Sequence, residues 1–280
     1  MNKIAIVTDS AACLLKPLIN QYNIHVVPFG LIWGRETFRD GVDMTPAEFY
    51  RRLRKSQTLP TTSQPLIEDF VSTYRSLAQT AGGIVSIHLA QNMSGTCRTA
   101  QMAAAMVAEV PVHIVDTGTA VMAQGFVVLA AARAAQAGRT LDQVVQAAKA
   151  MMARVHLLAV QDRLDYLARS GRVPNVIALV GSALRIVPIF AIRHGEVSVV
   201  GQARTKPRAV QAMLEQMVAR AGNRPVHAAV FHADVPDEAE ELRAKIATRF
   251  DCVGLFVTEF TPVMGAHTGP GLLGVAFYTE

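Results

Sequence analysis

Small hydroxyl side chains and glycines gather at three places where a predicted strand ends and a helix should begin. They occupy residues 61–65 (TTSQP), 93–96 (MSGT) and 116–119 (DTGT). At a helix N-terminus, unpaired backbone N–H groups and the helix dipole both favour an anion. Ligands of open parallel sheets bind outside the carboxyl ends of the strands, so the three clusters could converge on one small-anion pocket. Taken singly, each cluster is more typical of a simple helix cap.

A histidine stands in a late glycine-rich segment, GAHTGPG, at residues 265–271. Glycine lets a backbone approach a ligand closely. We expect His267 to lie in a loop just before the last strand, either as an exposed bystander or as a group that contacts a ligand. Most other histidines lie in or beside predicted strands, which is more typical of packed side chains than of metal ligands, so no metal site is predicted.

The sequence lacks motifs that several classes of enzyme need for their chemistry. Residues 9–12 (DSAA) follow the first predicted strand, where a dinucleotide-binding protein would carry GxGxxG. The sequence also has no GxxxxGK[ST] phosphate loop, no GxSxG elbow and no HExxH. Asp9 could be a phosphatase nucleophile, but Ala11 stands where such chemistry generally uses a second acid. We therefore expect Asp9 to cap the turn that follows it.

The composition is that of a compact globular protein, with 280 residues of which 51% are hydrophobic and 18% charged. Three widely spaced cysteines predict reduced thiols. The net charge of +5 is too scattered for a nucleic-acid footprint. No apolar stretch approaches the roughly 18 residues of a membrane span, and no signal peptide opens the sequence. We expect a cytoplasmic protein that is not inserted in a membrane.

Strand-like and helical patterns alternate in the first half, which favours a parallel sheet flanked by helices. The strand-like runs are residues 3–10, 24–33, 83–89 and 111–117. Two capping boxes, Thr45 with Glu48 and Thr140 with Gln143, predict helix starts.

The pattern changes near residue 153, where strands become more frequent. Six runs predict strands, at residues 155–161, 186–192, 197–203, 227–233, 252–260 and 272–278. Residues 193–196 (RHGE) predict a hairpin turn. Helices are expected over residues 175–184, 207–220 and 237–249. We predict an α/β fold of two domains: residues 1–153 with a parallel sheet flanked by helices, and residues 154–280 with a mixed or antiparallel sheet.

The ordered series of motifs along nearly the whole chain resembles the DegV family of bacterial fatty-acid-binding proteins. The matching segments are IVTDSAACL, VVPFGLIWGRETFRDGVDMTPAEFY, PTTSQP, SIHLAQNMSGTCRTA, IVDTGTAVMAQG, LDYLARSGRVP, GQARTKPRAV and GAHTGPG. The resemblance implies a carrier that buries a long-chain fatty acid between two α/β domains.

The resemblance also implies which groups hold the fatty acid carboxylate, namely hydroxyl side chains and a histidine. Matched by motif, the carboxylate-binding residues are Thr62, Ser63, Ser94, Gly95, Thr96 and His267. These residues belong to clusters that the anion-binding pattern also selects. The residues that line the acyl tunnel look like ordinary core residues in the sequence and are not predicted.

The family resemblance further implies a partner, a fatty acid kinase that phosphorylates the bound carboxylate to an acyl phosphate used in phospholipid synthesis. Arg172 and Arg204 match basic positions suited to engaging that kinase or the acyl phosphate. Without the resemblance, Arg172 is explained as a helix C-terminal cation and Arg204 as a surface charge at a strand end. The carrier would have no catalytic residue, no metal and no cofactor other than the bound fatty acid.

Two other functions are compatible with parts of the pattern. A binding protein for another lipid or amphipathic carboxylate would use the same residues. A phosphotransfer subunit related to dihydroxyacetone kinases would share the two-domain plan but would have to hold a phosphoryl donor. The sequence has no phosphate loop and no carboxylate cluster for Mg²⁺, which disfavours that second alternative.

Overall fold

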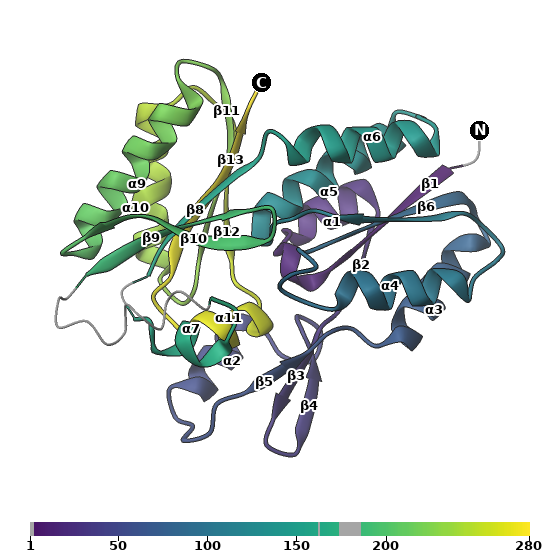
Figure 1. Ribbon diagram of the computed structural model, residues 1–280, viewed down its shortest axis with the longest axis horizontal. Coiled ribbons are helices and arrows are strands. Elements are labelled where there is room, and N and C mark those ends of the chain that lie inside the picture. Colours follow the sequence, from purple (N-terminus) through teal and green to yellow (C-terminus); the bar gives the residue numbers. More distant parts are fainter. Residues whose placement is uncertain (1–2, 162, 174–185) are drawn as a thin grey trace.

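Three β-sheets organise the described part of the chain, and helices cover two of them (Figure 1). The computed structural model describes residues 3–161, 163–173 and 186–280. The helix predicted over residues 175–184 lies outside the described residues.

The first sheet is parallel and has the strand order β2-β1-β6-β7. Its strands are β1 (Lys3–Asp9), β2 (Ile24–Val27), β6 (Ala81–His88) and β7 (Val112–Asp116). The helices around it are α1 (Lys16–Tyr22), α3 (Ile67–Ala78), α4 (Thr96–Ala105), α5 (Val121–Gln136) and α6 (Leu141–Met152). This arrangement confirms the predicted parallel sheet flanked by helices.

Both faces of the central strand β1 are buried, which explains its uninterrupted apolar run. Ala5 and Val7 pack with α3 and α4, whereas Ile4 and Ile6 pack in the cluster that contains α5. Helices thus cover both sides of the sheet. Because its four strands are parallel, their carboxyl ends meet at one edge.

A small antiparallel sheet, with the order β4-β3-β5, was not predicted. It consists of β3 (Gly30–Trp33), β4 (Glu36–Arg39) and β5 (Thr61–Ser63). Helix α2 (Pro46–Leu53) lies between β4 and β5 in the chain. The single strand predicted over residues 24–33 is wrong, because β2 ends at Val27 and β3 begins at Gly30 in another sheet. Pro28 stands between them and has no N–H group to continue a ladder.

The third sheet is mixed and has the order β10-β9-β8-β13-β11-β12. Its strands are β8 (His156–Val160), β9 (Val187–Arg193), β10 (Glu196–Ala203), β11 (Val226–His232), β12 (Cys252–Glu259) and β13 (Leu273–Thr279). β11 and β12 are parallel and the other neighbours antiparallel. The six strands predicted for this half are all present, and the predicted hairpin turn joins β9 to β10.

Two of the predicted helices, α9 (Lys206–Ala221) and α10 (Pro236–Arg249), cover one face of the third sheet (Figure 1). Leu158 and Val160 of β8 pack under them, whereas Leu157 and Ala159 point to the opposite face and join the core of the parallel-sheet half. The opposite face of the third sheet is therefore turned toward the first half of the chain.

Two short helices, α7 (Asp165–Ser170) and α11 (Pro262–Thr268), lie between the third sheet and the small antiparallel sheet (Figure 1). No residue range was predicted for either helix. The alternative explanation of Arg172 as a helix C-terminal cation does imply a helix at the position of α7, whereas α11 occupies the segment in which a loop was expected. Both are too short for a clear helical period in the sequence.

Candidate functional site

A cavity of about 170 Å³ lies between the uncovered face of the third sheet and the carboxyl edge of the parallel sheet. One water molecule needs only about 10–15 Å³ on this measure, so the cavity has room for a larger guest. Its apolar lining includes Ala11, Phe29, Leu89, Met93, Val121, Leu157, Ala159, Leu167, Val173, Phe190, Ile192, Val197, Phe231, Phe260, Val263, Met264 and Leu272. Seven polar residues line it as well: Thr62, Gln64, Ser94, Ser170, Arg172, His267 and Thr268. Gly95, which the sequence also predicted for the site, completes the lining.

The polar lining residues gather in one region of the cavity. Thr62 Oγ1 lies 2.9 Å from His267 Nε2, which joins the small sheet to α11. Gln64 packs against Gly95, since a Cβ at Gly95 would overlap the Gln64 amide, and this contact brings the Ser94 loop beside β5. Thr62, Ser94 and His267, which come from three distant segments, are therefore neighbours around one polar region.

His267 lies in the last turn of α11 and is half-buried, so the expectation of a loop position is wrong. Asp40, at the end of β4, fixes the beginning of that helix by accepting a hydrogen bond from the Val263 N–H at 3.0 Å. The same carboxylate accepts a 2.6 Å bond from the Ser10 hydroxyl. Burial raises the pKa of Asp40 above its ordinary value, and these hydrogen bonds act in the opposite direction.

Two glycines let α11 pack closely against its neighbours. A Cβ at Gly265 would overlap the rings of Phe49 and Tyr50 in α2, and one at Gly269 would overlap the ring of Tyr166 in α7. Gly269 also has a φ of +67°, which glycine adopts without steric cost. The glycine spacing around His267 thus serves helix packing, which orients the imidazole toward Thr62.

Burial, together with the nearby positive charge of Arg172, lowers the pKa of His267 from 6.5 to about 4. The imidazole is therefore neutral at pH 7, with one nitrogen able to donate and the other able to accept. A neutral His267 can hydrogen-bond Thr62 and still turn a donor toward an anion that enters the cavity.

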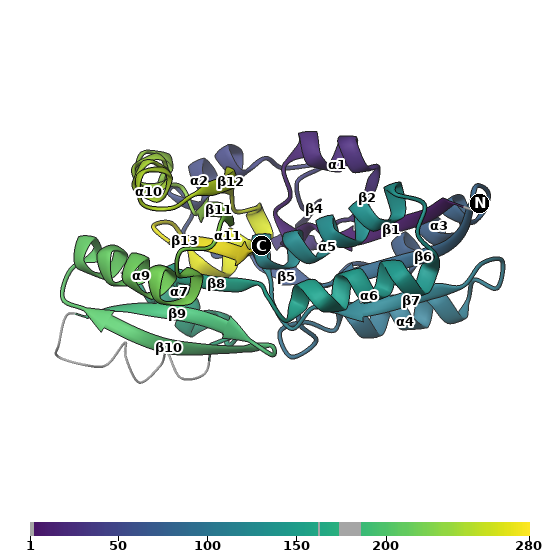
Figure 2. The same cartoon turned by 90° about the horizontal axis from the view of Figure 1, so that it is seen from above.

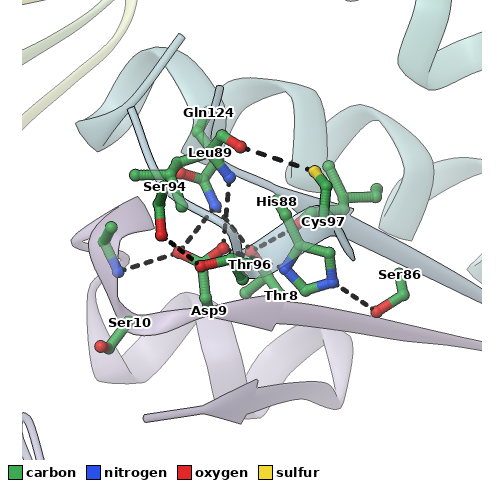
Figure 3. A network of polar contacts seen from close by, with 12 residues as sticks. Thr8, Asp9, Ser10, Ser86, His88, Leu89, Ser94, Thr96, Cys97 and Gln124 are labelled. Carbon is green, nitrogen blue, oxygen red and sulfur yellow. Dashed lines mark hydrogen bonds and ion pairs between the residues drawn. The ribbon is translucent and has the colours of Figure 1, made fainter. Parts of the chain in front are cut away.

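A buried polar network supports the loop that carries Ser94 (Figure 3). The Asp9 carboxylate accepts four hydrogen bonds: from the Ala11 N–H, the Leu89 N–H, the Gln124 amide and the His88 ring, at 2.9–3.2 Å. Ala11 and Leu89 both line the cavity, so one carboxylate fixes two segments of its wall. Asp9 does cap the turn that follows β1, as predicted.

Ser86, His88 and Asp9 form a chain that resembles a hydrolytic triad in its contacts. His88 Nε2 lies 2.7 Å from Ser86 Oγ, and His88 Nδ1 lies 2.9 Å from Asp9 Oδ2. All three side chains are fully buried, and the Tyr74 hydroxyl donates to Ser86 Oγ at 2.8 Å. Because no substrate can reach Ser86, Ser86 does not act as a nucleophile. The three linked side chains instead hold β6 against β1.

The loop of Ser94 is fixed from its other side as well. Ser94 Oγ lies 2.8 Å from the hydroxyl of Thr96, the first residue of α4, and the Cys97 thiol donates to the Leu89 carbonyl at 3.7 Å (Figure 3). Thr96 is fully buried and does not line the cavity. Its hydroxyl orients Ser94 instead.

Ser63 and the DTGT segment do not reach the cavity. The Ser63 side chain lies against Gly30 of the neighbouring strand β3. Residues 116–119 line a separate hollow with Lys149 and His194, and their own groups are mutually bonded, as in the Gly118 N–H to Asp116 bond of 3.0 Å. The predicted convergence of three clusters in one sheet is therefore wrong: two clusters meet, and one of these belongs to the small sheet.

The two predicted arginines occupy different places. Arg172 lines the cavity near His267, whereas Arg204 is an exposed residue just after β10 and does not line it. The sequence prediction also omitted Gln64, Ser170 and Thr268, three polar lining residues. All three stand within segments that the family motifs cover, TTSQP, ARSGRVP and GAHTGPG, so position in a motif was the available signal.

The described residues contain no helix that is long and apolar enough to span a membrane. Within the same part of the chain, no three His, Cys, Asp or Glu side chains are grouped as a metal site.

The fold and the cavity define a mixed α/β protein with an internal apolar chamber that ends in a small polar cluster. The chain belongs to the DegV family: the family model, described as an uncharacterised protein of the DegV family, matches residues 3–280. A DegV domain-containing protein of Streptomyces coelicolor is 40% identical over 274 residues, which are 97% of each chain.

Solved structures agree with this assignment. The crystal structure of DegV from Bacillus subtilis, described as a fatty acid binding protein, matches with a TM-score of 0.93 and 30% identity over 100% of both chains. A Thermus thermophilus DegV family protein, described by its fatty acid binding, gives a TM-score of 0.93 and 29% identity, covering 99% of this chain and 100% of that one.

Proposed function

We propose that this protein binds a long-chain fatty acid, with the acyl chain in the apolar cavity and the carboxylate beside Thr62, Ser94 and His267. The observation that carries the proposal is the lining of the cavity: apolar side chains throughout, with a polar cluster where three distant segments meet. An aliphatic chain with one charged end has the matching distribution of polarity. The fatty acid binding of the two structural relatives supports the same ligand class.

The acyl chain supplies most of the affinity in this proposal. For a chain of about 14 methylenes, burial at roughly 0.8 kcal/mol each amounts to about 11 kcal/mol before association costs. A charge-assisted hydrogen bond to the carboxylate adds only about 1.5–3 kcal/mol. The polar cluster therefore fixes which end of the ligand faces outward, and the apolar lining retains it.

The protein itself acts in this proposal as a cytoplasmic carrier without catalysis of its own. Residues 1–153 and 154–280 form two domains, and the fatty acid lies between them. A separate fatty acid kinase phosphorylates the carboxylate while the carrier holds it, and the acyl phosphate enters phospholipid synthesis. The exposed position of Arg204 outside the cavity supports a role in contacting that kinase.

The kinase contact can be separated from ligand binding with Arg204→Ala. We expect fatty acid binding to stay within about twofold of wild type, because Arg204 does not line the cavity, and phosphorylation by purified kinase to fall severalfold. An equal loss of binding and phosphorylation would reject Arg204 as a docking residue.

Organic extraction of the freshly purified protein, followed by mass spectrometry, tests the ligand. The expected result is a stoichiometric long-chain fatty acid. An extract that stays empty after incubation with mixed fatty acids would overturn the proposal and favour another amphipathic carboxylate. The control is protein in which Ala159 is replaced by Phe, which should narrow the cavity and reduce recovery of the longest chains.

A further inference from the structure

Ile192, near the end of β9, lines more than one space in the molecule. It belongs to the wall of the apolar cavity and also to the hollow of about 620 Å³ that the DTGT segment lines. Among the described residues, Ile192 is the one that the apolar cavity and this hollow have in common. The two spaces therefore meet at a single side chain.

Ile192 lies far along the third sheet from His267. The antiparallel register of β8 with β9, continued by one residue, places Leu157 opposite Ile192. Beyond the other end of β8, the Gln161 amide donates to the carbonyl of Thr268, next to His267, at 3.0 Å. The step from Gln161 to Leu157 covers about 13 Å, at roughly 3.3 Å per residue. A chain that has its carboxylate beside His267 and follows β8 therefore points its methyl end toward Ile192.

The chain on both sides of Ile192 is fixed. Phe190, which precedes it on the same face of β9, packs with Leu167 of α7. In the turn that follows, the Gly195 N–H donates to the Gly118 carbonyl at 2.7 Å. Ile192 itself is half-buried and packs against the hydrophobic core. The wall between the apolar cavity and the hollow is therefore held in place by its neighbours.

The hollow beyond Ile192 is charged, in contrast with the apolar cavity. Lys149 and Arg193 line it and are both exposed. Neither takes part in an ion pair within the described part of the chain. The described lining holds one acid, Asp116, whose carboxylate already accepts hydrogen bonds from two backbone N–H groups. A methyl group would gain little burial in such a space, whereas a carboxylate would gain charge-assisted contacts.

We propose that Ile192 sets the upper limit of acyl chain length, because its side chain closes the apolar cavity against the charged hollow. The proposal rests on the proposed fatty acid function and adds what limits the length of the ligand. Each buried methylene raises the affinity about fourfold, since about 0.8 kcal/mol corresponds to that factor. A chain that already reaches Ile192 gains nothing from one more methylene, which would have to displace the isoleucine. The affinity therefore rises with chain length up to a definite limit and then stops rising.

Binding of saturated acids from decanoate to icosanoate to delipidated protein, in steps of one carbon, measures this limit. Ile192→Ala removes three carbon atoms and should move the limit up by about two to three carbons. Ile192→Val removes one methyl group and should move it by less, with less disturbance of the fold. Leu272→Ala is the matched control, because Leu272 lines the apolar cavity but not the hollow, and it should leave the limit unchanged.

An α,ω-dicarboxylic acid tests whether the enlarged cavity reaches the hollow. In wild type the second carboxylate would lie in the closed apolar end, where an unpaired charge is costly. The diacid should therefore bind at least about 100-fold more weakly than the monoacid of the same length. In Ile192→Ala the second carboxylate can reach Lys149 and Arg193, so this ratio should narrow to about tenfold or less. Leu272→Ala should keep the wild-type ratio.

The outcomes separate this proposal from the fatty acid function. If wild type binds fatty acids and the limit stays at one length in Ile192→Ala and Ile192→Val, Ile192 does not set it. The proposal is also overturned if Leu272→Ala moves the limit equally, or if the diacid ratio in Ile192→Ala stays at the wild-type value. If wild type binds no fatty acid, the proposed function falls and the role of Ile192 falls with it. Binding of decanoate reports that each variant is folded.

Discussion

His267 illustrates how the surroundings of one residue set its chemistry. Its imidazole is half-buried, contacts Thr62 and lies near Arg172, and its pKa is lowered to about 4. The unfolded chain would protonate this histidine near pH 6.5, well before the native protein does. A proton taken up only by the unfolded state favours unfolding, so the sign of the effect is a loss of stability as the pH falls.

The first prediction concerns this pH dependence. The contribution of the neutral His267 to the free energy of unfolding should be fully present above pH 6.5 and decline as the pH falls toward 4. Below pH 4 it should level off, after a total loss of about 3 kcal/mol. Urea denaturation at pH 7, 6, 5 and 4 measures it. His25, His156 and His232 also have lowered pKa values, so the comparison with His267→Gln isolates the one residue. If the free energy of unfolding depended on pH in the same way in wild type and in His267→Gln, the lowered pKa of His267 would be contradicted.

Ser94 lines the same cavity as His267, and its hydroxyl is oriented by Thr96. The second prediction is that Ser94→Ala weakens fatty acid retention about threefold to tenfold, as expected for one hydrogen bond, and lowers acyl phosphate formation by a larger factor. The Ser94→Ala substitution should leave the burial of the acyl chain unchanged and remove a hydroxyl that orients the carboxylate. Phosphorylation with purified kinase gives the measurement, and an unchanged rate would count against Ser94. Ser63→Ala is the matched control, since Ser63 does not line the cavity.

The residues of the site were only partly predictable from the sequence. Thr62, Ser94 and His267 stand in hydroxyl and glycine clusters, and the structure places all three around one cavity. The buried network below them was not predictable, because Ser86 and His88 look like ordinary strand residues until β6 is paired with β1. The DTGT segment shows the converse: its composition suits an anion, but Asp116 already accepts from Gly118 and Gln91.

At the scale of elements, the β9–β10 hairpin links the two halves of the chain. Its turn reaches the loops of the parallel sheet (Figure 2). There the Gly195 N–H donates to the Gly118 carbonyl at 2.7 Å. A Cβ at Gly195 would lie 3.2 Å from the Asn92 amide and 3.3 Å from Ala90. The strands behind this turn contribute Phe190, Ile192 and Val197 to the cavity wall. The turn therefore holds one wall of the cavity against the first half.

The third prediction tests this contact with Gly195→Ala. The left-handed φ of +78° costs about 1–2 kcal/mol for any L-residue, and displacement of the Asn92 side chain adds to it. Gly34→Ala is the matched control, because Gly34 also has a positive φ, +66°, in a hairpin turn but has open space around it. We expect both variants to lose stability in urea, and only Gly195→Ala to release fatty acid severalfold faster. Equal release rates would show that the turn does not retain the wall.

Most elements were predictable because their periodicity is strong. Strands buried on both faces, such as β8, give long apolar runs, and the stripe of Val210, Met213 and Met217 marks α9. The small sheet and α11 were missed for local reasons. Three-residue strands such as β5 have too few positions for a period, and the glycines at 265 and 269 suggested a loop although they serve close helix packing.

At the scale of the whole molecule, the two halves of the chain share one hydrophobic core. One apolar cluster contains Ile6 of β1, Val128 of α5, Leu157 of β8 and Phe231 of β11, so side chains from both halves pack together. The cavity interrupts this shared core between the third sheet and the parallel sheet. A guest that fills it would add contacts to both halves at once, and its loss would remove them from both.

The last prediction follows from that position of the cavity. If a fatty acid occupies the cavity as proposed, its removal should lower the Tm and added fatty acid should restore it, since a ligand at 100 times its Kd stabilises the native state by about 2.7 kcal/mol. The effect should increase with chain length: dodecanoate has four methylenes more than octanoate, worth about 3 kcal/mol of binding at 0.8 kcal/mol each. Calorimetry of delipidated protein with each acid at one concentration makes the comparison. Equal Tm shifts for the two acids would mean that the chain is not buried, because a site that held only the carboxylate would not distinguish them.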